Sequence, residues 1–107
     1  MFGSFFNTAD VDKFADWILG ELKRAIPPGF DPGTRNIVER VNKLDGQIGN
    51  RTIQFAREVR LNIYKKAHLA ARVREGMIVH GYPEPFVKSF SYGLLARIQN
   101  ASNKRSA

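Results

Sequence analysis

The chain contains no cysteine among its 107 residues. This absence excludes a disulfide framework, thiolate catalysis and zinc sites built on cysteine. Histidine is scarce as well: His68 and His80 are the only two, and they form neither an HExxH motif nor any comparable ligand spacing. We therefore expect neither a metal site nor a cofactor.

Long apolar runs are also missing. The longest charge-free run, residues 1–9, is far shorter than the roughly 18 apolar residues that a transmembrane helix requires. The same segment lacks the basic start and the apolar stretch of a secretory signal. We expect a cytoplasmic protein without a transmembrane segment, and we do not expect its Phe-rich start to hold it on a membrane surface.

Catalytic motifs form a third absence. The sequence has no P-loop, no GxSxG nucleophile motif and no dinucleotide-binding fingerprint. The two histidines have no carboxylate companion close in sequence. We therefore predict that the protein is not an enzyme.

Acidic residues are scarce in the second half of the chain. Residues 1–50 hold six Lys/Arg and seven Asp/Glu, a net charge of −1, whereas residues 51–107 hold eleven and three, a net charge of +8. Such asymmetry predicts an anionic partner for the second half. The alternative is a solvated basic face that maintains solubility.

Helical periodicity dominates what is present, and no segment alternates like a strand. We predict an all-α fold, a small bundle of three to four helices. It forms a single helical domain over residues 1–107, with 1–6 and 102–107 as candidates for flexible ends. The first helix is expected to begin at Asn7 or Thr8, and three prolines and two glycines within residues 26–33 end it.

The segment 34–79 can be interpreted in two ways. Gly46 and Gly49 favour a break or kink within 44–51, and we prefer this interpretation. An apolar stripe that continues in register to Phe55 favours one long central helix instead. Uninterrupted, that helix would be about 69 Å long, and it would require a partner helix at a dimer contact.

The main helix is predicted from Asn50 to Val79, followed by a turn at 80–85 and a last helix from Glu84 to Ala101. Small side chains dominate its principal apolar face, and a second, weaker apolar stripe lies beside them. The principal face comprises Ile53, Ala56, Val59, Ile63, Ala67, Ala70 and Ala71, and the weaker stripe comprises Phe55, Leu69 and Val73. Alanines allow another helix to approach closely.

Opposite this principal face, basic residues recur at helical spacing and form a basic ridge. We predict that they bind an acidic partner or phosphates; they are Arg57, Lys65, Lys66, His68 and Arg72. Arg51, Lys88, Arg97, Lys104 and Arg105 would add phosphate contacts on nucleic acid. Because the ridge lacks interleaved aromatic residues, such binding would be weakly specific for sequence.

Two further arginines, Arg60 and Arg74, fall within the principal apolar face. A buried guanidinium is costly unless it is paired. We therefore predict buried ion pairs for both: Arg60 with a carboxylate of another helix, and Arg74 with Glu84 unless it bonds the last carbonyls of its own helix. An anion-binding pocket is the alternative.

Several large apolar side chains lie off the main stripes. Phe2, Phe5, Trp17, Phe55 and Leu69 are predicted to form an interface, most simply in a homodimer. The resulting hypothesis is a non-enzymatic helical interaction or adaptor protein that presents a basic helix face to an acidic partner. The alternative is a nucleic-acid-binding protein that uses the same face.

Overall fold

The computed structural model describes residues 8–30, 35–59 and 62–106, without the side chains of residue 35 and of 101–106. Over these residues the chain forms four α-helices and no strand: α2 (Ala9–Ala25), α3 (Arg35–Glu58), α4 (Ile63–Val79) and α5 (Glu84–Ser106). The all-α prediction is confirmed, and the bundle has four helices. Its last helix continues to Ser106, past the predicted end at Ala101.

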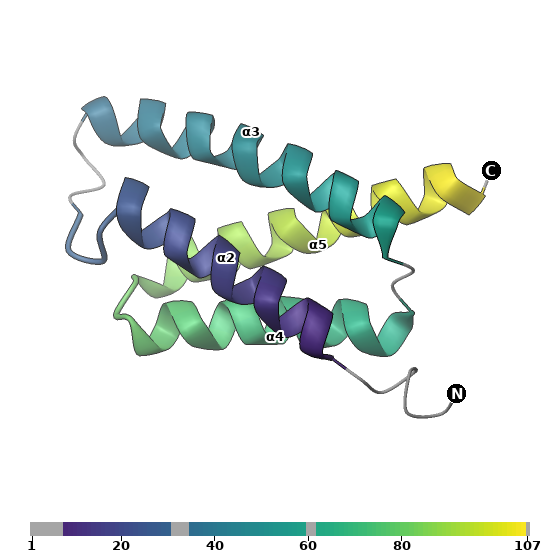
Figure 1. The fold of residues 1–107 in the computed structure, drawn as a ribbon. Helices are drawn as coiled ribbons and strands as arrows, with labels where there is room; N and C mark the ends of the chain where they lie inside the picture. The colour runs from purple at the N-terminus through teal and green to yellow at the C-terminus, as the bar shows by residue number, and fades with distance from the viewer. Residues whose placement is uncertain (1–7, 31–34, 60–61, 107) are drawn as a thin grey trace.

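The four helices are arranged as a ring in which each contacts two others (Figure 1). The sequence of contacts around the ring is α2, α3, α5, α4 and back to α2. Two edges of this ring, α2–α3 and α4–α5, share no helix. Each of these two edges carries a surface groove.

The core lies inside the ring. Each of the four helices contributes apolar side chains to it. The most deeply buried large side chains are Val11, Ile18, Leu22, Ile26, Leu69, Val73, Met77 and Ile98. Aromatic rings close one end, where Phe86 packs 5.2 Å from Phe30 and 5.7 Å from Tyr82, measured between ring centroids.

Both interpretations of segment 34–79 are wrong. Helix α3 passes through Gly46 and Gly49 and ends at Glu58. The glycines cost about 1 kcal/mol each relative to alanine. Burial of Leu44, Ile48 and Phe55 on one stripe outweighs this, at roughly 1.5–3 kcal/mol for each side chain.

The chain changes direction after Glu58 instead. Asn62 caps the next helix, and its side-chain oxygen accepts a hydrogen bond of 2.8 Å from the backbone N–H of Lys65. The longest dimension of the molecule is 47 Å, well below the length of the uninterrupted helix. Helix length therefore gives no argument for a dimer.

Helix α4 is rotated relative to the prediction. Leu69, Val73 and Met77 are fully buried, whereas Ile63 is 84% exposed and Ala67 is also exposed. The stripe predicted to be weaker thus faces the core, because its side chains are larger and bury more apolar area than alanines. The predicted interface role of Leu69 is wrong for this reason, and so is that of Phe55, which stacks on Phe14 in the core at 4.2 Å between centroids.

The turn between α4 and α5 is a Schellman motif. Gly81 has a φ of +89°, a conformation that side chains with a Cβ rarely adopt. Its N–H donates to the Ile78 carbonyl, and the N–H of Tyr82 donates to the Met77 carbonyl. The predicted end of the main helix at Val79 is confirmed.

Glycines in α3 and α4 differ in their surroundings, and this predicts opposite effects of alanine. A Cβ at Gly76 of α4 would overlap the Leu19 side chain of α2, whereas a Cβ at Gly46 would meet nothing. We expect Gly76→Ala to lower the free energy of unfolding by about 1–3 kcal/mol. Gly46→Ala should raise it by up to ~1 kcal/mol. Urea denaturation measures both, and equal stability of the two variants would contradict this close approach of α2 and α4.

Tyr82 generates a second prediction. Its hydroxyl donates a 2.6 Å hydrogen bond to the buried carbonyl of Ile26, and burial raises the pKa of Tyr82 to about 12. Because the folded state resists ionisation, this phenol stabilises the fold below its unfolded pKa of about 10. That stability is lost as the pH rises towards 12.

We expect Tyr82→Phe to lower the free energy of unfolding by about 1 kcal/mol near neutral pH. The variant should also lose stability less steeply in strong alkali than the unmodified protein. Ultraviolet phenolate titration, combined with denaturation at each pH, measures both effects. An unchanged titration curve in the variant would contradict the assignment of the late-ionising phenol to Tyr82.

Candidate partner-binding surface

Part of the predicted basic ridge lies against α2. Lys65 is buried, and its Nζ lies 3.4 Å from Asp10 Oδ2 of α2. One turn later, His68 Nε2 lies 2.7 Å from Asp12 Oδ1. These two residues of the ridge therefore contact an acidic stripe on the neighbouring helix.

Arg72 continues the same contact. Its Nε lies 3.5 Å from Asp12 Oδ1, and its Nη2 lies 3.6 Å from Asp16 Oδ1. The acids of α2 and the bases of α4 thus pair along two helical turns. The prediction that Lys65, His68 and Arg72 present free charge to a partner is wrong, because carboxylates of α2 already neutralise or bind them.

Asp12 is the centre of this contact. The hydrogen bond with His68 lowers the pKa of the Asp12 carboxyl below its ordinary value of 3.8. Partial desolvation opposes that effect, while the hydrogen bond from Thr8 and the positive charge of Arg72 add to it. The folded state therefore favours the ionised carboxylate.

The other predicted site residues are dispersed. Arg57 is exposed near the end of α3, and Trp17 of α2 is 38% exposed. Arg74 is exposed and forms no ion pair with another described residue, so its predicted buried pair is wrong. Phe2, Phe5 and Arg60 lie outside the described residues.

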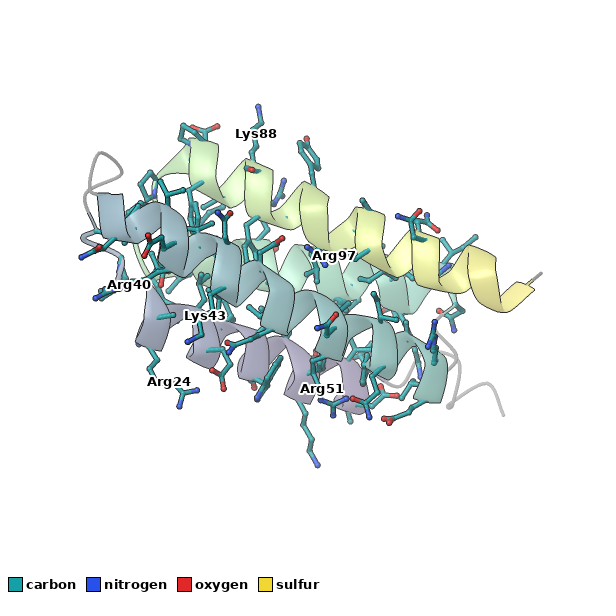
Figure 2. The ribbon with its side chains drawn as sticks, turned by 90° about the horizontal axis from the view of Figure 1, so that it is seen from above. Arg24, Arg40, Lys43, Arg51, Lys88 and Arg97 are labelled. Carbon is teal, nitrogen blue, oxygen red and sulfur yellow. The ribbon has the colours of Figure 1, made fainter. Side chains whose placement is uncertain are left out.

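Two of the predicted phosphate contacts lie on α5, and their surroundings differ. Arg97 is ion-paired with Asp45 of α3, across the α3–α5 contact, whereas Lys88 is exposed (Figure 2). Arg51 borders a groove between α2 and α3. The side chains of Lys104 and Arg105 lie outside the described residues.

A groove runs along the exposed edge between α4 and α5, which we call the α4–α5 groove. Its volume is about 380 Å³. Alanines form its α4 wall, and Tyr92 and Leu95 stand on the α5 side. The full lining comprises Ile63, Lys66, Ala67, Ala70, Ala71, Arg74, Ser91, Tyr92, Leu95 and Gln99. This α4 wall is the alanine face that the sequence predicted to be in the core.

The α4–α5 groove combines apolar surface with positive charge. Ile63 and Tyr92, which is 66% exposed, present large apolar side chains to solvent beside it. Lys66 and Arg74 are the charged residues among the described lining, and neither forms an ion pair with another described residue. They are eight positions apart on α4, a separation of about 12 Å along the helix axis. No acidic residue is found among the described residues that line the groove.

Within the described residues, no group of three or more His, Cys, Asp or Glu side chains is placed to hold a metal ion. The described helices also include none that is long and apolar enough to span a membrane.

The Asp12 contact predicts a specific response to acid. Because the folded pKa of Asp12 is lowered, its contribution to stability is present above about pH 4. It is lost as the pH falls through the folded value. We expect Asp12→Asn to lower the free energy of unfolding by about 1 kcal/mol near neutral pH. The difference from the unmodified protein should shrink below about pH 4, where the unmodified carboxyl is also neutralised.

Denaturation at a series of pH values measures this difference. Glu39→Gln serves as the control, because Glu39 is exposed on α3 and forms no ion pair with another described residue. An equal pH dependence for the two variants would contradict the role assigned to Asp12.

Comparison with known proteins found no matching family model, no matching curated protein and no matching solved structure.

Proposed function

We propose that this protein is a non-enzymatic interaction module that binds an acidic, amphipathic helix of a partner protein in the α4–α5 groove. The observation that carries the proposal is an apolar groove whose charged lining, among the residues that the structure describes, consists of two cations, Lys66 and Arg74, without an ion pair to another described residue. An amphipathic helix places apolar anchors on one face and can carry carboxylates on both sides of them.

The size of the lining side chains supports a helix as the occupant. Ala67, Ala70 and Ala71 keep the α4 wall low, and small residues let a second helix approach to 8–10 Å between axes. Tyr92 offers an aromatic ring at the rim, a residue type that is enriched in interfaces. Exposure of Ile63 and Tyr92 leaves apolar area that a partner would remove from water.

The charges favour an acidic partner over a second copy of the chain. In a two-fold dimer through this groove, the same patch would meet itself. Lys66 and Arg74 of one protomer would then face the same two cations of its partner, and like charges repel. A homodimer through this face is therefore less favoured than an acidic partner.

A charge-swap experiment tests this proposal. The probe is a fluorescent helical peptide of about four turns with Leu anchors at i, i+3 and i+7 and Glu residues on both flanks; a second peptide carries Lys instead. We expect the Glu peptide to bind roughly tenfold more tightly, since each rim charge pair contributes a few tenths to 1 kcal/mol. The double variant Lys66→Glu/Arg74→Glu should reverse this preference. Anisotropy titration measures all four combinations.

Ala67→Glu provides the steric arm of the test. Ala67 is exposed, so the fold should tolerate the change while the groove is blocked and peptide affinity falls at least tenfold. Asn42→Glu on the exposed side of α3 is the matched control and should leave affinity unchanged. If the double variant keeps the original preference, or if Ala67→Glu binds normally, the proposal is wrong. A dimer by light scattering that Ala67→Glu dissociates would favour the second copy instead.

A further inference from the structure

The edge of the ring opposite the α4–α5 groove carries a second groove, between α2 and α3. It consists of two adjoining hollows with volumes of about 490 Å³ and 410 Å³. Glu21, Leu44 and Gln47 line both hollows, so the two form one continuous depression. We call it the α2–α3 groove.

Positive charge lines both halves of this groove. Arg51 borders one half, and Arg24, Arg40 and Lys43 border the other. Figure 2 shows these four side chains on the α2–α3 side of the bundle, whereas Lys88 points away from α5 on the opposite side. From Arg40 to Arg51 the cations of α3 extend over about 16 Å of helix axis.

Little negative charge opposes these cations. Among the described lining residues Glu21 is the one acid, and it is ion-paired with Arg24. Arg51 has a long ionic contact of 4.0 Å with Glu58, and its guanidinium lies 5.9 Å from the centroid of the Phe14 ring. Arg40 and Lys43 form no ion pair with another described residue. The groove therefore keeps a net positive charge that an anionic ligand can neutralise.

Trp17 supplies an aromatic surface in the same groove. It is 38% exposed and stacks on Phe14 with 5.7 Å between ring centroids. Phe14 in turn stacks on Phe55 in the core. This stack holds the indole in place from the core side. A fixed, partly exposed aromatic ring beside cations is the arrangement on which unstacked nucleobases bind.

Polar amides complete the lining. Gln47, Asn50 and Gln54 follow one another along the α3 side of the hollow that contains Trp17. Each amide carries both a hydrogen-bond donor and an acceptor; that of Gln54 also donates a 2.9 Å hydrogen bond to Glu58. Together the amides can bond the edges of different bases. A purely acidic peptide would use the cations but has no aromatic ring to stack on the indole face.

We propose that the α2–α3 groove binds single-stranded nucleic acid. Trp17 stacks with one base, the amides contact base edges, and Arg24, Arg40, Lys43 and Arg51 contact phosphates. A duplex is disfavoured, because its bases are stacked on one another and offer no free face to Trp17. This site is separate from the α4–α5 groove and does not depend on the function proposed for it.

Trp17 is the single tryptophan of the chain, so its fluorescence reports directly on this site. The probes are oligo-dT and oligo-U strands of about twelve nucleotides, a length within the range that single-stranded sites cover. We expect both strands to quench the fluorescence on binding. An abasic strand with the same number of phosphates should bind more weakly and quench little. A matched duplex should bind without quenching.

Salt dependence tests the phosphate contacts. Four contacts predict a slope of log K against log salt of about −3, at ~0.7 per contact with single strands. Arg40→Ala/Lys43→Ala should reduce the slope to about half and weaken binding at least tenfold at low salt. Lys88→Ala, which removes an exposed cation outside the groove, should change neither quantity appreciably.

Trp17→Ala tests the stacking contact, with anisotropy of a labelled strand as the readout. We expect at least a fivefold loss of affinity for oligo-dT and little loss for the abasic strand, and Trp17→Phe should restore part of the affinity. Circular dichroism verifies that the variants keep their helices. If oligo-dT neither binds nor quenches at low salt, the proposal is wrong.

The proposal is also wrong if poly-glutamate binds as tightly as oligo-dT and Trp17→Ala changes neither affinity. The groove would then be an unspecific surface for polyanions. Ala67→Glu, which blocks the α4–α5 groove, should leave strand binding intact. The two proposals can therefore fail independently.

Discussion

The rotation of α4 about its own axis is the constraint on which the rest of the structure depends. A helix turns as a rigid unit, so fixing one of its faces fixes all of them. Burying Leu69, Val73 and Met77 turns Lys65, His68 and Arg72 towards the acids of α2. The same rotation turns the alanine face outward beside α5. The apolar core, the ion pairs with α2 and the α4–α5 groove thus all follow from this one rotation of α4.

The interactions that fix the rotation of α4 differ in energy. Each of the three buried side chains contributes roughly 1.5–3 kcal/mol, whereas partly exposed ion pairs contribute about 0.2–1 kcal/mol each. Apolar burial therefore supplies most of the energy that holds α4 in place. The acidic stripe of α2 favours this rotation of α4 over others. Any other rotation would leave its carboxylates without their cationic partners or would place Lys65 in the core unpaired.

Much of the fold could be predicted from the sequence, because the prolines and glycines of residues 26–33 end α2 and the turn at 80–85 separates α4 from α5. The boundary between α3 and α4 could not be predicted, because Gly46 and Gly49 indicated a break too early in the chain. The actual start of α4 is marked only by its N-cap residue, Asn62. In α3 the continuous burial of Leu44, Ile48 and Phe55 overrides the glycines, which local propensity alone cannot show.

The candidate site was harder to predict for a related reason. Periodicity counts apolar positions but does not weigh their size, so the alanines of α4 appeared to be the core face and Leu69 appeared to lie beside it. One signal was available. Asp12 and Asp16 of α2 have the same four-residue spacing as His68 and Arg72 of α4, and such matching stripes can pair between helices. Lys66 and Arg74 belong to the groove only because α4 is rotated as it is.

The order of helices around the ring has a consequence for occupancy. Because the α2–α3 and α4–α5 edges share no helix, a molecule seated on one edge does not cover the other. If both edges bind ligands as proposed, the bundle would hold the two at a fixed separation and would raise the local concentration of each for the other. Neither ligand would have to leave for the second to bind, so the bundle would join its ligands and would not select between them.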